Sequence, residues 1–370
     1  MQLQAIDWFV IGAYVVFAIS VGMALARRAS RSVDEFFLSG RTLPWWIAGT
    51  SMVATSFAAD TPLVVTGWVR DFGIWKNWLW WCYCTTSMLG VFIFVRLWRR
   101  GGVMTKAELA ELRYGGPEAK VLRGTLGVFH AFLTNTIVLC WVMLAAAKIA
   151  EGLFEIDKAL ALTIACALSM SYSLLSGFWG VVLTDLLQFI MSVVGAIVLA
   201  AFAWHACSGM EGIQAAISNG AIDASRLQLF PGDGDWDFWR SDFWTAPIAG
   251  LCVYFGLSWW AAEIVDGSGV TVQRVAACRD ERHGVLAVLW FTIAHYALRP
   301  WPWIVVALAS LVILPTIEIE APVAGKVHEV IDADGVQAVL IDSATGRVRV
   351  PIVHDQATAD WGPIVKVKAG

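Results

Sequence analysis

Long apolar runs alternate with short polar loops along the first 315 residues of the chain. At about 20 residues for each crossing of a bilayer, this pattern predicts about eight transmembrane helices. The spans fall near residues 6–26, 44–67, 77–98, 122–148, 158–176, 178–204, 243–263 and 285–314. The predicted fold class is therefore an all-α polytopic membrane protein.

After Pro315 the pattern changes to short runs in which apolar and polar residues alternate. The turn signals DADG (332–335), SATG (343–346) and WGP (361–363) separate these runs, as is typical of β-strands. The sequence thus predicts a transmembrane domain over residues 1–315 and an extramembrane β-rich segment over residues 316–370. The last run, IVKVKAG, stops as though in the middle of a fold, so we expect this segment to be an insertion that is cut short.

The composition supports a membrane location. The chain is 58% hydrophobic and 15% charged, and its mean hydropathy is +0.66, whereas a soluble domain is roughly half apolar and about a quarter charged. The seven cysteines show no paired spacing, which favours small buried side chains over a disulfide or metal framework. We expect the lipid bilayer as a partner and no nucleic acid.

Lysine and arginine residues predict the orientation. They gather after the first, third and seventh spans, near residues 27–41, 96–113 and 274–282, and such loops lie in the cytoplasm. The N-terminus and the 316–370 segment are then outside the cytoplasm. The first span lacks a basic n-region and a cleavage site, so we interpret it as an uncleaved helix in the cell (inner) membrane.

The second span is interrupted in its middle. In SMVATSFAADTPLVV (51–65), polar residues, Asp60 and Pro62 break an apolar run. A charge at this depth costs several kcal/mol unless it is paired or hydrated, and proline removes a helical hydrogen bond. Non-helical backbone is tolerated in a membrane only where protein or water satisfies it. We therefore expect a break near residues 55–61 whose freed carbonyls bind a ligand; the alternative is a proline kink with Asp60 in a structural role.

Four motifs carry a resemblance to a known family. The stretch DEFFLSGRTLPWWIAGTSMVATSFAADTPL (34–63) is similar to the start of the sodium:solute symporter family. The stretches TKAELAELRYG (105–115), GFWGVVLTDLLQF (177–189) and VQRVAACRDERHG (272–284) resemble three later family elements in the same order. The resemblance covers roughly residues 7–314. It implies a leucine-transporter-like inverted-repeat fold, here incomplete, and sodium-coupled transport of a small solute by alternating access.

The resemblance also implies a sodium site. The backbone carbonyls of Ala54 and Phe57 would be two of its ligands, and Asp185 would be a carboxylate on the inward sodium path. Sodium is a hard cation that prefers such oxygen ligands. The remaining family ligands are hydroxyl residues on a later helix, beyond residue 370. Asp185 has an alternative role as a helix N-cap together with Thr184. Sodium is the coupling ion, and no other metal or cofactor is expected.

Five side chains are candidates for solute binding. Asp60 and Thr61 occupy positions where the family places polar residues that face the substrate, and Trp259 and Glu263 end the seventh span beside the expected cavity. An ungapped count from Gln273 places His295 where sugar-carrying members have a sugar-contacting lysine. Each has a structural alternative. Asp60 could accept hydrogen bonds from freed N–H groups, tryptophans at this depth also form interfacial belts, and membrane histidines commonly bond a neighbouring helix.

Three functional classes remain to be compared. A sodium-coupled symporter explains the broken helix and all four motifs. The alternative is a solute-sensing, transporter-like membrane domain of a larger receptor or sensor kinase. An enzyme is not expected, because the sequence places no His-Glu-x-x-His motif, Ser-His-Asp set or metal cluster at membrane depth. The sequence does not identify the solute.

Overall fold

The computed structural model describes most of the chain and divides it into two compact units. The described residues are 4–58, 60–154, 157–232, 239, 245–261, 268–314, 316–320, 328–332, 335–339, 347–351 and 366–367. The first unit comprises residues 1–65, 76–197 and 231–303, and the second comprises residues 66–75, 198–230 and 304–370. All the side-chain clusters described below belong to the first unit.

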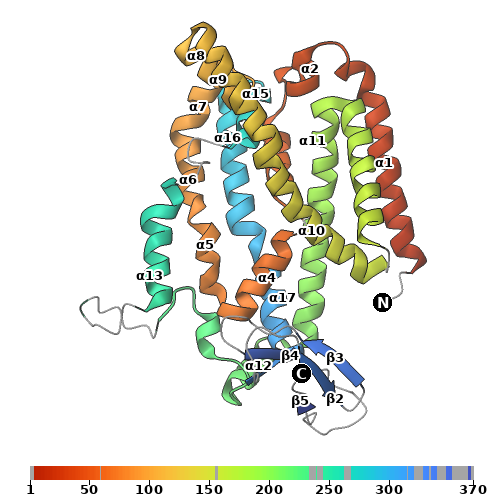
Figure 1. Ribbon diagram of the computed structural model, residues 1–370, viewed down its shortest axis with the longest axis vertical. Helices are drawn as coiled ribbons and strands as arrows, with labels where there is room; N and C mark the ends of the chain where they lie inside the picture. Colours follow the sequence, from red (N-terminus) through yellow and green to blue (C-terminus); the bar gives the residue numbers. More distant parts are fainter. Residues whose placement is uncertain are drawn as a thin grey trace. The chain divides into compact units, whose positions relative to one another are not determined.

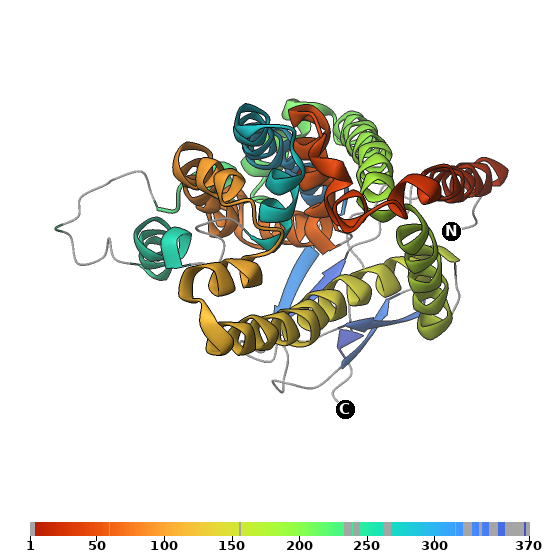
Figure 2. The same ribbon diagram turned by 90° about the horizontal axis from the view of Figure 1, so that it is seen from above.

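Helices dominate the described residues (Figure 1). From the N-terminus these are α1 (Ala5–Ala29), α2 (Val33–Leu38), α3 (Trp45–Thr55), α4 (Asp60–Phe72), α5 (Trp78–Trp81), α6 (Tyr83–Leu89), α7 (Val95–Gly101), α8 (Lys106–Tyr114), α9 (Gly116–Val128) and α10 (Asn135–Phe154). The later helices are α11 (Lys158–Ala206), α12 (Gly209–Ser218), α13 (Ala246–Val253), α14 (Trp259–Ala261), α15 (Gly269–Ala277), α16 (Glu281–Ile293) and α17 (Pro300–Ile313). Single π-helical turns at Gly90–Phe94, Phe129–Thr134, Tyr254–Ser258 and Ala294–Leu298 join several of them into longer rods. Figures 1 and 2 show α9 and α10 as one such rod.

Hydroxyl and carboxylate side chains set the starts of several helices. The first N–H groups of a helix have no partner within the helix, and a short polar side chain at the N-cap satisfies one of them. Such a side chain accepts a backbone N–H bond at the starts of α2, α8, α15 and α16, from Ser32, Thr105, Ser268 and Asp280.

The predicted spans agree with the helices. In the described residues, five helices are long and apolar enough to cross a membrane: Ala5–Ala29, Ile74–Gly101, Gly116–Glu151, Lys158–Ala206 and Glu281–Ile313. Gly177, at φ 59° and ψ −158°, divides Lys158–Ala206 into two limbs, which match the predicted spans 158–176 and 178–204. A Cβ atom at this glycine would lie 2.9 Å from the Phe36 carbonyl oxygen, so both the φ angle and the space favour glycine. The other two predicted spans correspond to the α3–α4 pair and to the shorter helix Pro247–Ala261.

The second span is broken, as the sequence predicts. Helix α3 ends at Thr55, residues 56–58 are not helical, and α4 begins at Asp60. Pro44 is the N-cap residue of α3, in agreement with a predicted start near that residue. Helix α4 begins at Asp60, near the end of the predicted break at residues 55–61, and Pro62 lies within its first turn, where the missing N–H costs little.

Tight packing fixes the position of α3 in the first unit. Gly49 lies so close to α16 that a Cβ atom would approach the Ala287 carbonyl oxygen to 2.5 Å. Leu43, just before α3, donates its N–H to the Ala277 carbonyl at 3.0 Å and accepts the Arg279 N–H at 3.1 Å. Buried apolar side chains of α3, α7, α15 and α16 complete this core. The end of α3 at the helix break is therefore held on a rigid support.

Strands occur in the described part of residues 316–370. They are β1 (Thr316–Glu320), β2 (His328–Asp332), β3 (Gly335–Val339), β4 (Arg347–Pro351) and β5 (Lys366–Val367). β1 pairs antiparallel with β4, with Glu318 opposite Arg349, and β2 pairs antiparallel with both β3 and β5. The location of this segment outside the membrane stays a prediction.

Candidate functional site

The last turn of α3 brings carbonyl groups to the helix break. The Ser56 N–H donates to the Val53 carbonyl at 3.1 Å, and the Phe57 N–H donates to the Ala54 carbonyl at 2.9 Å. A carbonyl oxygen has two lone pairs, so the Ala54 oxygen can accept this bond and still bind a cation. The structure thus places the predicted ligands Ala54 and Phe57 at the break, and their role as sodium ligands stays a prediction.

A first polar cluster lies beside this turn and consists of Ser51, Thr55, Asp185 and Arg274. The Asp185 Oδ2 atom accepts the Ser51 hydroxyl at 2.5 Å and the Thr55 hydroxyl at 3.4 Å, and it lies 3.2 Å from the Arg274 Nη2 atom. Arg274 also donates to the Ser51 hydroxyl at 2.9 Å and to the Thr55 hydroxyl at 2.5 Å. Three elements therefore meet here: α3, the second limb of α11, and α15.

Three of the four residues of the first cluster are buried, and Thr55 is exposed. Ser51, Asp185 and Arg274 are all buried, and Ser51 and Thr55 face it together because residues i and i+4 share one face of a helix. Burial lowers the pKa of Arg274, while the negative charge of Asp185 opposes this shift. An ion pair in such surroundings needs further hydrogen bonds to be stable, and here the Ser51 and Thr55 hydroxyls accept from Arg274 and donate to Asp185.

The position of Asp185 does not favour the capping alternative. The second limb of α11 follows Gly177, and Asp185 lies eight residues further, well inside the helix. The neighbouring Thr184 hydroxyl donates back to the Gly180 and Val181 carbonyls at 3.0 and 2.9 Å. The carboxylate of Asp185 is directed to α3 and α15, where it could exchange one cation for another.

A second polar cluster lies at the break itself and consists of Ser56, His295 and Arg299. The Arg299 Nη1 atom donates to the Ser56 carbonyl at 2.8 Å and contacts the Val53 carbonyl at 3.5 Å. His295 places its Nδ1 atom 2.9 Å from the Ser56 hydroxyl and its Nε2 atom 3.3 Å from Arg299. The buried guanidinium of Arg299 also lies 5.3–5.8 Å from the ring centroids of three aromatic residues: Phe57, Trp80 and Trp303.

The two clusters include residues that the sequence analysis did not select. In the sequence, Arg274 belongs to a family motif and to the orientation signal, whereas Arg299 belongs to neither, although an arginine inside the span 285–314 is a signal in its own right. The contacts of His295 agree with the interhelical hydrogen-bond alternative, since both ring nitrogens have protein neighbours. Its predicted solute contact stays untested.

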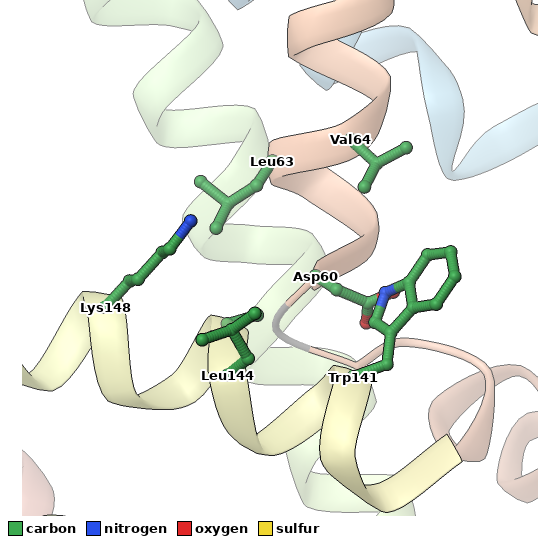
Figure 3. Close-up of a pocket in the computed structure, with 7 residues that line it drawn as sticks. Asp60, Leu63, Val64, Trp141, Leu144 and Lys148 are labelled. Atoms are coloured by element: carbon green, nitrogen blue, oxygen red, sulfur yellow. The ribbon is translucent and has the colours of Figure 1, made fainter. Parts of the chain in front are cut away.

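A cavity of about 350 Å³ opens between α4 and α10 (Figure 3). Asp60 reaches it from the first residue of α4, and Trp141 and Lys148 reach it from α10. Thr61, the next residue after Asp60, donates its N–H to the Ala58 carbonyl at 3.2 Å.

The remaining candidates lie apart from this cavity or outside the described structure. The Trp259 carbonyl accepts the Thr86 hydroxyl, which ties α14 to α6. Glu263 lies outside the described residues.

Comparisons with known proteins agree with the resemblance found in the sequence. The family model described as "Sodium:solute symporter family" matches residues 36–335. Sodium/glucose cotransporter 1 of Mus musculus is 26% identical over 294 residues, which cover 76% of this chain and 43% of the relative. The Sodium/glucose cotransporter of Vibrio parahaemolyticus is 26% identical over 283 residues, which cover 75% of this chain and 50% of the relative. The chain thus spans about half the length of the curated relatives that it matches.

A solved structure supports the fold. It is described as the substrate-bound outward-open state of a Na+-coupled sialic acid symporter. Its TM-score is 0.66 at 18% identity, with 84% of this chain and 62% of the other chain covered. At this identity the likeness shows the fold alone. The family and these relatives are transporters rather than enzymes.

Proposed function

The chain belongs to the sodium:solute symporter family, and we propose that it serves sodium-coupled transport of a small solute across the cell membrane. The observation that carries this proposal is the broken helix between α3 and α4, whose first half bonds the buried carboxylate of Asp185 through the Ser51 and Thr55 hydroxyls. The matched relatives are cotransporters rather than sensor kinases, which favours transport over the sensing alternative.

In this proposal sodium binds at the Ala54 and Phe57 carbonyls and then passes Asp185 on its way to the cytoplasm. Asp185 now pairs with Arg274, so a sodium ion that reaches the carboxylate competes with a tethered cation for the same oxygen. Such competition keeps the carboxylate neutralised when no ion is present and allows rapid release. Asp60, Thr61, Trp259, Glu263 and His295 are the proposed solute contacts.

The driving force is sufficient for concentrative uptake. A membrane potential of 100 mV supplies about 2.3 kcal/mol for each charge that moves inward, and about 1.4 kcal/mol corresponds to a tenfold concentration ratio. One sodium ion per solute therefore sustains a gradient of more than about tenfold.

Uptake assays test this proposal. We expect liposomes that contain the full-length protein to accumulate solutes from a labelled panel only with an inward sodium gradient. Asp185→Asn should raise the half-saturating sodium concentration by about tenfold or more, since one charge at 4 Å contributes about 4 kcal/mol at an effective dielectric of 20. The matched control is Glu151→Gln, because Glu151 pairs with Lys158 on the surface. Equal half-saturating sodium in wild type and Asp185→Asn would contradict the role of Asp185, and uptake without sodium would contradict the coupling.

The proposed orientation has its own test. The positions of lysine and arginine place the N-terminus and residues 316–370 outside the cytoplasm and the 101–120 loop inside. A single cysteine at position 335, in a variant that lacks the native cysteines, should react with an impermeant thiol reagent in intact cells, whereas one at position 107 should not. The opposite pattern would contradict this orientation.

A further inference from the structure

The cavity between α4 and α10 carries a charge of each sign at separate places. Asp60 contributes a carboxylate from α4, and Lys148 contributes an ammonium group from α10 (Figure 3). The rest of the lining consists of hydrocarbon and an indole ring, from Leu63, Val64, Trp141, Leu144 and Ala145. The volume of about 350 Å³ is at the small end of the range for ligand sites.

One carboxylate oxygen of Asp60 lacks a hydrogen-bond partner in the described structure, although the charge of the carboxylate also interacts with Arg299. The Asp60 Oδ1 atom is buried and has no hydrogen-bond partner there. A buried carboxylate oxygen without a donor is unfavourable, and a cationic group from a ligand would remove that penalty. Because Asp60 also lines the cavity, an ammonium group is the ligand contact that its negative charge favours.

The wall on α10 is a single helical stripe. Positions 141, 144, 145 and 148 follow the i, i+3, i+4, i+7 spacing, which places them on one face. Trp141 is 60% exposed, so its indole is free to cover the body of a ligand. Ionisable residues within spans face a cavity or the protein interior rather than lipid, and Lys148 ends this stripe at the cavity.

We propose that this cavity binds a small zwitterion whose ammonium and carboxylate groups are separated by a hydrocarbon segment, as in an ω-amino acid. The ammonium group pairs with Asp60, the hydrocarbon lies against Trp141 and the leucines, and the carboxylate meets Lys148. A sugar suits the lining less well, because its many hydroxyl groups would face hydrocarbon between the two charges. This inference rests on the proposed function, since it names the solute class of a transporter.

Binding to the purified full chain tests the proposal without sodium or a gradient. Labelled 6-aminohexanoate is the probe, and unlabelled 6-aminohexanoate, hexanoate, hexylamine and D-glucose are the competitors. We expect 6-aminohexanoate to compete at concentrations at least about tenfold lower than either single-charge analogue, since each lost charged contact weakens binding by about that factor. D-glucose should not compete. Equal competition by hexylamine, hexanoate or D-glucose would overturn the proposal, as would no saturable binding of the probe.

Two variants test which residue binds each end of the ligand. Asp60→Asn should weaken competition by hexylamine and leave hexanoate unchanged, whereas Lys148→Gln should do the reverse. Glu151→Gln is the matched control, because Glu151 lies on the same helix but pairs with Lys158 away from the cavity. A uniform loss across all competitors in both variants would overturn the assignment. If Asp60→Asn does not fold, the Lys148→Gln variant and the competition series with the wild-type protein still test whether the cavity binds the zwitterion.

The outcomes separate this inference from the proposed function. Zwitterion binding without any sodium-driven uptake supports the site and contradicts the coupling. Sodium-driven uptake of another solute, with no zwitterion binding, overturns the site and leaves the coupling in place.

Discussion

Two buried arginines in the described part of the first unit, Arg274 and Arg299, are held in different ways. Arg274 lies 3.2 Å from the carboxylate of Asp185 and bonds two hydroxyls of α3. Arg299 has no carboxylate within 4 Å among the described residues, although the charge of Asp60 acts on it from further away; backbone carbonyls, His295 and aromatic rings surround it. The C-terminal end of a helix carries roughly half a negative charge, so the broken end of α3 takes the place of a carboxylate for Arg299.

The different contacts of Arg274 and Arg299 matter for the proposed transport mechanism, because both arginines contact the last two turns of α3. Ser51 and Thr55 face Arg274, whereas Val53 and Ser56 face Arg299. A movement of α3 that opens a path at the break would have to loosen at least one of these attachments. We therefore compare the two attachments by removing each in turn.

We expect the largest loss of unfolding free energy when Arg274, which pairs with the Asp185 carboxylate, is replaced. Arg274→Met leaves Asp185 as a buried charge without a cation, and breaking such a pair costs about 3–5 kcal/mol. The double variant Arg274→Met with Asp185→Leu removes both charges and should recover most of that loss. Chemical unfolding of the purified protein measures both variants. A double variant no more stable than Arg274→Met would show that the charge on Asp185 is not the cause.

We expect a smaller loss of unfolding free energy when Arg299, which bonds backbone carbonyls, is replaced. Arg299→Met leaves carbonyl partial charges, rather than a full charge, without a partner, so the loss of unfolding free energy should be about 1.5–3 kcal/mol, as for hydrogen bonds to charged groups. Arg299→Lys should recover only part of it, because an ammonium group cannot bond the carbonyls and stack on three rings at once. The same unfolding measurement applies. A loss at Arg299→Met equal to that at Arg274→Met would contradict the distinction between the two sites.

The sequence predicted the framework of this region better than its contacts. The break in α3–α4 was predictable because Asp60 and Pro62 interrupt an apolar run, and both are local signals. The division of α11 was predictable because SLLSGFWG separates two apolar stretches. The pairing of Asp185 with Arg274 was not, because the two residues are far apart in the chain and meet only through packing of α15 against α3.

In the candidate site, too, the sequence did not predict contacts between residues that are far apart in the chain. Asp60 was selected for its position in the broken span, yet its cavity partners Trp141 and Lys148 lie on a helix that carried no motif. No role was predicted for Arg299, because it belongs to none of the four family motifs. Its role depends on the carbonyls of Val53 and Ser56, and backbone ligands leave no mark in side-chain patterns.

We expect the smallest loss of stability when His295 is replaced. His295 links the Ser56 hydroxyl to Arg299, at 2.9 and 3.3 Å. His295→Phe keeps an aromatic ring beside Trp80, which now lies 5.4 Å from the imidazole, and removes only the two polar contacts. A hydrogen bond contributes about 0.5–1.5 kcal/mol net, so the loss of unfolding free energy should be near 1 kcal/mol, below that expected for Arg299→Met.

A double-mutant cycle of His295→Phe with Ser56→Ala isolates the hydrogen bond that these two residues share, because residues in direct contact show coupling of at least about 0.5 kcal/mol. Measured coupling near zero would show that Arg299 holds Ser56 through the backbone alone, and that His295 remains available for a ligand.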